Sequence, residues 1–409
     1  RKHPGKFYAL PQAPQQFKQL LMTAGFDRYF QIAPCFRDED ARADRSPGEF
    51  YQLDMEMAFA TQEDVFAVLE RVLPPVFAKF SGWEADRPPF RRIAYRDALE
   101  TYGTDKPDLR NPLTVCDISD LMQGCGFGAV EGKTVKAIAV RNAGIARKQI
   151  DKLAEEFKVK TEGGAMFWFK LDENGAPAGG ISKFVAERAD ALKQRLGIAA
   201  GSFVAVLAED KLALAQKRAG VLRTMLGTAL DLLEKNVYRF CWIVDFPMYE
   251  IGEESGQLEF CHNPFSMPQG GMKALEEKDP LDVLAYQYDI VCNGVELSSG
   301  AVRNHDPEIM VKAFSLVGLG KEDVVKKFPA LYHAFEYGAP PHAGVAPGVD
   351  RMVMLISDTV NIREVIAFPM NAKARDLLMN APSPVEQKQL DDVHIAVSYT
   401  HLRAHETGR

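Results

Sequence analysis

Residues 29–36 read YFQIAPCF, residues 37–48 read RDEDARADRSPG, and residues 49–59 read EFYQLDMEMAF. The first and third stretches have strand-like composition, and the charged stretch between them ends in the turn residues SPG. Two strands joined by a charged loop predict an antiparallel hairpin, and with it a central sheet. Side chains alternate between the two faces of a strand, so one face of the third stretch is polar. The residues on that face are Gln52, Asp54 and Glu56.

This polar strand face has two interpretations. Antiparallel sheets often turn such a face to solvent, which would leave Gln52, Asp54 and Glu56 without a role. The loop before it favours a binding site, because Arg37 and Glu39 place a cation and a carboxylate where the first strand ends. An arginine fork binds two oxygens of a phosphate or carboxylate at once. A charged loop is also often merely solvated, so both interpretations stay open.

A second hairpin is predicted by Asn293-Gly294, since this pair suits a two-residue turn with positive φ at both positions. Such a turn pairs residue 291 with 296 and residue 289 with 298. Asp289 and Glu296 then share one face as diagonal neighbours, about 7–8 Å apart at the backbone. Mg²⁺ takes one or two carboxylates plus phosphate oxygens, so this pair could hold it. The alternative is two acids exposed on a hairpin.

Two arginines follow this hairpin in the sequence. Simple alternation points Arg303 to the other face of its strand, so it joins the acidic pair only if a bulge or bend lies near Gly300.

Residues 338–348 predict a glycine- and proline-rich turn that enters an apolar helix at 352–356. Arg351 lies in the first turn of that helix, where a cation opposes the helix dipole and so suggests an anionic ligand such as a triphosphate. The alternative is a glycine-rich entry to a core helix.

Length and composition narrow the class of protein. The 409 residues suit two or three domains, and 46% hydrophobic with 26% charged residues is typical of a soluble globular enzyme. No apolar run is long enough for a membrane helix, and the first residues do not read as a signal peptide. The six cysteines form no CxxC pair, which argues against a zinc site or a disulfide framework and favours a reducing, cytoplasmic compartment. The net charge of -7 means that any nucleic-acid surface must be a local basic patch.

The composition and the secondary-structure pattern of the sequence change between residues 112 and 238. This segment is rich in Ala, Lys and Gly, mixes helical and strand patterns, and carries no dense site chemistry. We expect it to be an inserted domain that divides another domain into residues 1–111 and 239–397. Residues 398–409 are expected to be a tail without function.

Two helices are predicted near the start of the chain. Residues 14–24 have the helical period, and residues 62–80 do so with an interruption at Pro74-Pro75. The expected apolar face of the first helix consists of Phe17, Leu20, Leu21 and Ala24.

Four segments of the sequence resemble motifs of the bacterial-type aspartyl-tRNA synthetases, a family of class II aminoacyl-tRNA synthetases. An aspartate-binding segment, class II motif 2, a segment ahead of the insertion and class II motif 3 correspond to residues 8–20, 36–56, 103–110 and 344–351. The likeness runs from Arg1 to about Val397. It implies an α+β fold, in which helices flank an antiparallel sheet and a bacterial-type (GAD-like) domain is inserted.

The resemblance implies an aspartate site. Gln15 and Asp54 would hold the ammonium group, while Lys18 and Arg303 would pair with the side-chain carboxylate and so reject a neutral amide. The full implied aspartate-binding set is Gln15, Lys18, Arg37, Asp54, His262, Asn263 and Arg303.

The resemblance also implies an ATP site. Arg37 would bridge the substrate carboxylate and the α-phosphate, Glu39 would contact the adenine, and Arg351 would bind the γ-phosphate. Arg37 and Arg351 are therefore the expected catalytic residues, and Asp289 and Glu296 would hold Mg²⁺. The full implied ATP-binding set is Arg37, Asp38, Glu39, Gln52, Glu296, Gly348, Val349, Asp350 and Arg351.

The implied reaction is an in-line attack of L-aspartate on ATP, followed by transfer to tRNA(Asp), with tRNA(Asn) as an open second acceptor. Charge stabilisation and positioning suffice for this chemistry. A homodimer of the full-length protein, a cytoplasmic location and no membrane partner are also implied.

The sequence departs from the family at several places. Ala13 stands where many relatives have serine, and Asn263 stands where some have a second histidine. An anticodon-binding barrel and motif 1 are not found, so we expect the chain to be a fragment. The alternatives are an asparagine- or lysine-specific class II ligase, a synthetase-like binding protein without activity, and a fragment that is inert by itself.

Overall fold

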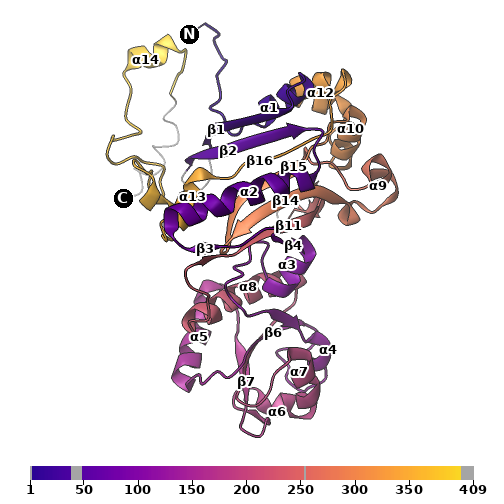
Figure 1. The fold of residues 1–409 in the computed structure, drawn as a ribbon, viewed down its shortest axis with the longest axis vertical. Coiled ribbons are helices and arrows are strands. Elements are labelled where there is room, and N and C mark those ends of the chain that lie inside the picture. Colours follow the sequence, from indigo (N-terminus) through magenta and orange to yellow (C-terminus); the bar gives the residue numbers. More distant parts are fainter. Residues whose placement is uncertain (1, 38–47, 253–254, 398–409) are drawn as a thin grey trace, which may run out of the picture. The chain divides into compact units, whose positions relative to one another are not determined.

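The computed structural model describes residues 2–37, 48–252 and 255–397 of the chain (Figure 1). The chain divides into a larger and a smaller unit. The larger unit comprises Gln16–Phe30 and Asp54–Pro347. The smaller unit comprises Arg1–Gln15, Gln31–Leu53 and Gly348–Arg409.

A seven-stranded sheet, in the order β1-β2-β16-β15-β14-β11-β4, forms the framework of the larger unit. Its strands are β1 (Arg28–Phe36), β2 (Glu49–Ala58), β4 (Arg91–Ala94), β11 (Phe240–Pro247), β14 (Leu284–Cys292), β15 (Val295–Val302) and β16 (His342–Val345). Neighbouring strands from β2 to β11 are antiparallel, and β4 joins β11 in parallel. Together with the flanking helices, this sheet confirms the predicted α+β class.

Strand β16 corrects one prediction. Residues 338–348 are predicted to be a turn, yet residues 342–345 pair with β2 on one side and β15 on the other. All four of these residues are buried. A short strand that is buried on both faces has no alternation, so periodicity cannot distinguish it from a loop.

Helix α2 (Gln62–Ser81) packs against β16 and crosses the sheet in Figure 1. The predicted interruption at Pro74-Pro75 is wrong, because a buried stripe at four-residue spacing holds the helix against the sheet. This stripe consists of Val65, Leu69, Leu73 and Phe77. On the same helix, Phe66 stacks on Trp242 of β11 with 4.0 Å between ring centroids.

Helix α1 (Gln15–Thr23) has the predicted position but not the predicted face. Phe17 is 70% exposed, whereas Lys18, Gln19 and Met22 are buried. The polar side chains of Lys18 and Gln19 point inward because they pair there with Asp54 and His342. The helical period alone does not show such pairing. The other elements around the main sheet are β3 (Glu84–Ala85), α3 (Tyr95–Tyr102), β10 (Val237–Tyr238), β12 (Tyr249–Ile251), β13 (Leu258–Phe260), α9 (Gly271–Glu277), η2 (Pro280–Asp282), α10 (Pro307–Leu316), α11 (Lys321–Lys327) and α12 (Pro329–Glu336).

A second, five-stranded sheet has the order β5-β6-β9-β7-β8. Helices α5 and α8 pack over the core on one of its faces, and α4, α6 and α7 over the core on the other. All these elements fall inside residues 112–238, the segment predicted as an inserted domain, although the domain division itself stays a prediction. Their bounds are β5 (Val115–Asp117), α4 (Ser119–Met122), β6 (Thr134–Val140), α5 (Arg147–Lys160), β7 (Phe167–Leu171), β8 (Pro177–Ala178), α6 (Ser182–Val185), η1 (Ala186–Arg188), α7 (Ala189–Leu196), β9 (Phe203–Glu209) and α8 (Leu212–Ala229).

The insertion is fixed to the main sheet through α8 and the loop 103–113. A Cβ atom on Gly103 would lie 2.3 Å from the backbone nitrogen of Gly220 in α8, so the two backbones meet without side chains between them. Arg223 of α8 is buried and donates hydrogen bonds to three carbonyl oxygens of this loop. These acceptors are Leu113 at 2.6 Å, Asn111 at 2.7 Å and Asp108 at 3.0 Å.

The smaller unit contains α13 (Val349–Ile356), η3 (Ile362–Val365), α14 (Gln387–Asp392) and the parts of β1 and β2 that belong to it. The Tyr51 backbone N–H donates to Asp350 Oδ2 at 2.9 Å, and Gln52 forms an isolated bridge with Gly348. These contacts fix the start of α13 to β2. None of the helices in the described ranges is long and apolar enough to cross a membrane.

Replacing Arg223 with methionine should lower the free energy of unfolding by about 3 kcal/mol, because buried carbonyl groups of the loop 103–113 lose their charged donor. Urea denaturation followed by circular dichroism measures this loss. Lys217→Met is the control, since Lys217 is exposed on the same helix. Equal stability of the two variants would contradict the anchoring role.

Candidate functional site

The polar face of β2 is buried where it belongs to the larger unit. Asp54 and Glu56 are 1% and 0% exposed, so the solvent-exposed interpretation is wrong for both. The Nζ atom of buried Lys18 lies 2.6 Å from Asp54 Oδ1 and 3.2 Å from Glu56 Oε2. Asp54 Oδ2 is also buried, and it has no hydrogen-bond partner in the described part of the chain. The site therefore has one carboxylate oxygen available to a cationic ligand.

Arg303 supplies the second cation of this cluster. Its Nε and one terminal nitrogen donate to the two Glu56 oxygens at 2.9 and 3.2 Å. Burial by itself would raise the pKa of Glu56, but the charges of Arg303 and Lys18 and the hydrogen bonds from Arg303 together hold it below the ordinary value. Lys18 and Arg303 thus balance Asp54 and Glu56, which is what allows the four charges to be buried together.

Gly344 makes room for this cluster. A Cβ atom there would lie 1.9 Å from Glu56 Oε2 and 2.2 Å from the carbonyl oxygen of Met55. The close approach at Gly344 is therefore to the chain's own β2.

His342 and Gln19 connect α1 to the sheet. His342 Nδ1 lies 2.8 Å from the Pro340 carbonyl oxygen, which can only accept, so Nδ1 carries the proton. Its Nε2 then accepts from the Gln19 side-chain nitrogen at 3.2 Å. Burial is the main cause that lowers the pKa of His342, to about 4, so the ring is neutral near pH 7. Sequence reasoning missed both residues, because their role depends on a contact between residues that lie 323 positions apart in the sequence.

The acidic hairpin forms at the predicted turn, with φ of 50° at Asn293 and 83° at Gly294. Residue 291 pairs with 296 as predicted, but a bulge follows, and Asp289 lies opposite Ser299 instead of residue 298. The bulge shifts the alternation of β15 by one residue. Arg303 therefore shares the face of the acidic pair, and the irregularity required for this lies near residue 297, not at the predicted Gly300.

The surroundings of Asp289 disfavour the charged form of its carboxyl group. Burial, and next the charge of Glu296, raise the pKa of Asp289 well above its ordinary value. Asp289 Oδ1 is buried without a hydrogen-bond partner among the described residues. Lys106 Nζ lies 3.2 Å from Glu296 Oε2, although sequence reasoning assigned Lys106 no role. No group of three potential metal-binding side chains occurs in the described ranges, so a cation here would need further ligands from a substrate.

His262 and Asn263 lie beside β11 and β14. The His262 ring meets the Phe246 ring edge-on, with 5.1 Å between centroids, and burial is the main cause that lowers the pKa of His262. The Asn263 side chain accepts from the Phe265 backbone N–H at 2.9 Å. No hydrogen bond between described residues joins either one to Lys18 or Arg303, so their predicted contact with the amino acid stays a prediction.

The smaller unit carries all the residues predicted to bind nucleotide except Glu296, which lies in the larger unit. The Arg37 guanidinium lies 5.0 Å above the Phe50 ring, and its buried Nε has no hydrogen-bond partner among the described residues. Gln52, Gly348, Val349 and Asp350 meet where α13 begins, and half-buried Arg351 lies in the first turn of that helix. Gln15 is half-buried at the start of α1. Asp38 and Glu39 lie outside the described residues.

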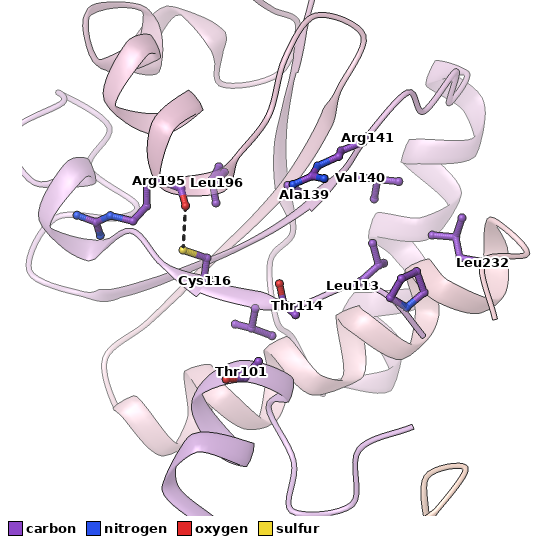
Figure 2. Close-up of a pocket in the computed structure, with 12 residues that line it drawn as sticks. Thr101, Leu113, Thr114, Cys116, Ala139, Val140, Arg141, Arg195, Leu196 and Leu232 are labelled. Carbon is purple, nitrogen blue, oxygen red and sulfur yellow. Dashed lines mark hydrogen bonds between the residues drawn. The ribbon is translucent and has the colours of Figure 1, made fainter. Parts of the chain in front are cut away.

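A separate cavity of about 510 Å³ lies in the insertion, where β5, the end of β6 and the end of α7 meet (Figure 2). Figure 2 shows the Cys116 sulfur facing the backbone oxygen of Arg195, at 4.0 Å. None of the predicted site residues lines this cavity, so it is distinct from the charged clusters described above.

Comparison with known proteins gives consistent similarities. The family described as tRNA synthetases class II (D, K and N) matches residues 1–372. The aspartate–tRNA(Asp/Asn) ligase of Rickettsia felis is 53% identical, covering 98% of this chain and 69% of the relative. That of Zymomonas mobilis is 56% identical, covering 97% and 68%, and the aspartate–tRNA ligase of Streptomyces avermitilis is 53% identical, also covering 97% and 68%. A solved structure, the aspartyl tRNA synthetase from Entamoeba histolytica, is 19% identical with a TM-score of 0.45, and this chain spans 53% of its length.

Acid should weaken the fold through His342. Its folded-state pKa of about 4 lies below the ordinary 6.5, so as pH falls through this interval the unfolded chain takes up a proton that the folded chain does not. The stability difference between wild type and His342→Gln should shrink by roughly 3 kcal/mol between pH 7 and pH 4. Urea titrations across this range measure it. His333→Gln, at an exposed histidine, should leave the pH dependence near that of wild type.

Proposed function

The chain belongs to the class II tRNA synthetases of the aspartate, lysine and asparagine group, and from this premise we propose that it activates L-aspartate with ATP and transfers it to tRNA(Asp). Membership confirms the family resemblance seen in the sequence. The relatives named above act on aspartate by their names, and several of those names include both tRNA(Asp) and tRNA(Asn). Charging of tRNA(Asn) is therefore part of the proposal.

The buried cluster of Lys18, Arg303, Asp54 and Glu56 carries the choice of aspartate. Asp54 Oδ2, which has no partner in the part of the chain that the structure describes, suits the substrate ammonium, with Gln15 as the second expected partner. Lys18 and Arg303 suit the side-chain carboxylate, because they are buried cations whose positions are fixed by Asp54 and Glu56. A neutral amide would lose the attraction that both cations offer a carboxylate, and a lysine side chain would meet like charge. This argues against the asparagine and lysine alternatives.

Arg37 and Arg351 would contact the phosphates of ATP during the reaction. Arg37 is held over Phe50, and its Nε has no hydrogen-bond partner among the described residues, which suits it to the charge that grows on the α-phosphate during attack by the aspartate carboxylate. Arg351 would bind the γ-phosphate at the start of α13, and the carboxylate oxygen of the substrate is itself the nucleophile. Asp38, Glu39, His262 and Asn263 complete the proposed substrate contacts.

Asp289 and Glu296 would hold Mg²⁺. Asp289 Oδ1, buried beside a second acid and without a hydrogen-bond partner in the described ranges, fits a hard divalent cation that takes its remaining ligands from phosphates and water. When bound, the ion offsets charge on the phosphates of ATP.

We also propose a homodimer and a cytoplasmic location. Several phenyl rings near the edge strand β1 are exposed on the larger unit, which is typical of an interface. These rings are Phe17 at 70%, Phe26 at 55%, Phe30 at 74% and Phe59 at 77% exposure. The cysteines are all free thiols, consistent with a reducing compartment.

ATP–pyrophosphate exchange tests the function. Aspartate should support exchange at least 10³-fold better than asparagine or lysine, because the buried cations require a carboxylate. Lys18→Arg, which keeps the charge but displaces it, should raise the KM for aspartate by about 10-fold or more, while Lys217→Met should not. Exchange with asparagine alone would refute the proposal, and no exchange from a folded chain would favour the inert alternative.

Sedimentation equilibrium tests the dimer. Phe30→Glu should shift the chain toward monomer by a factor of at least about 10 in the dissociation constant, since the exposed ring would no longer be buried at an interface. Phe80→Glu is the control, because Phe80 is 66% exposed on α2, away from β1 in the sequence. A wild-type chain that stays monomeric at micromolar concentration would contradict the dimer.

A further inference from the structure

Lys106 lies on the loop between α3 and the first strand of the insertion. Its Nζ atom is 2.9 Å from Asp105 Oδ2 and 3.2 Å from Glu296 Oε2. The side chain is 27% exposed, so the ammonium lies at the edge of the acidic hairpin and not in open solvent. The proposed reaction assigns no task to this cation.

The loop that carries Lys106 is held from two sides. Arg223 of α8 binds the carbonyl oxygens of Asp108 and Asn111 at 3.0 and 2.7 Å. At the hairpin turn, a Cβ atom on Gly294 would lie 3.2 Å from Asp108 Cβ, so the loop also rests on the hairpin. Because the loop is held on both sides, its backbone places the Lys106 ammonium beside Glu296.

The position is one where a cation is needed. Asp289 is 4% exposed and keeps one oxygen without a hydrogen-bond partner in the described ranges, beside a second carboxylate. Two acids in such a place repel each other, and a positive charge close to either one relieves the repulsion.

We propose that Lys106 is a built-in counter-ion of the Asp289–Glu296 pair, which leaves Glu296 when a divalent cation binds and then contacts the phosphate oxygens that this cation carries. The inference rests on the proposed function, in which this pair holds Mg²⁺. Lys106 would then weaken metal binding to the free protein and strengthen binding of ATP. The insertion takes part indirectly, because its helix α8 fixes the loop.

These opposite effects distinguish a counter-ion from a merely structural lysine. Lys106→Met should bind Mn²⁺ roughly tenfold more tightly than wild type in the absence of nucleotide, and its KM for ATP in the exchange reaction should rise by a similar factor. Lys106→Arg should stay closer to wild type in both measurements because it keeps the charge. Lys235→Met, at an exposed ion pair with Asp231, is the control.

Electron paramagnetic resonance of Mn²⁺ titrated into the full chain measures the metal affinity, with Glu296→Gln as reference. Loss of Mn²⁺ binding in Glu296→Gln together with tighter binding in Lys106→Met supports the inference. Loss in Glu296→Gln with unchanged affinity in Lys106→Met overturns the inference and leaves the metal assignment intact. Unchanged binding in Glu296→Gln overturns the metal assignment itself, and the inference with it.

Discussion

The larger unit depends on one buried carboxylate, that of Glu56. It receives two hydrogen bonds from Arg303 and lies 3.2 Å from Lys18 Nζ, so β2, the end of β15 and α1 meet at a single charge. Removing either cation would leave an uncompensated charge in the interior, which costs far more than an exposed ion pair. The backbone of β16 can pass this point only because Gly344 has no side chain. The same contacts around Glu56 therefore determine both the strand order at the centre of the sheet and the chemistry of the site.

Local chemistry explains which parts of the fold could be predicted. Asn293-Gly294 specifies its turn through backbone conformation, and β2 shows its two faces through alternation, so the second hairpin and the pairing of β1 with β2 were expected from the sequence. The bulge near residue 297 could not be seen, because inserting one residue into a ladder leaves no distinct residue type behind. Strand β16 was missed since burial on both faces removes alternation. Helix α1 showed the correct period but the wrong face, because Lys18 is drawn inward by acids on a distant strand.

The candidate site, like the fold, contains residues that the sequence could indicate and residues that it could not. Alternation along β2 indicated Asp54, and the family resemblance implied Lys18 and Arg303. The structure brings these three into one cluster with Glu56. Lys106 and His342 were not recognised, since a lysine in a charged loop and a histidine in a presumed turn acquire meaning only from what the fold sets beside them. The predicted nucleotide contacts remain predictions that rest on motif likeness and on the orientation of Arg37.

The distance between Glu56 and Arg303 along the chain, 247 residues, has a consequence for biosynthesis. At about 5–20 residues per second, Arg303 is made roughly 10–50 seconds after Glu56. Throughout that interval the nascent strands β1 and β2 have neither their ion-pair partner nor the strands β15 and β16 that separate them from β14. The whole insertion is synthesised in the meantime and can fold on the ribosome first. The last central strands to be made then enter a gap in the sheet, which leaves the edge of β2 unpaired and open to chaperones until β16 has been made.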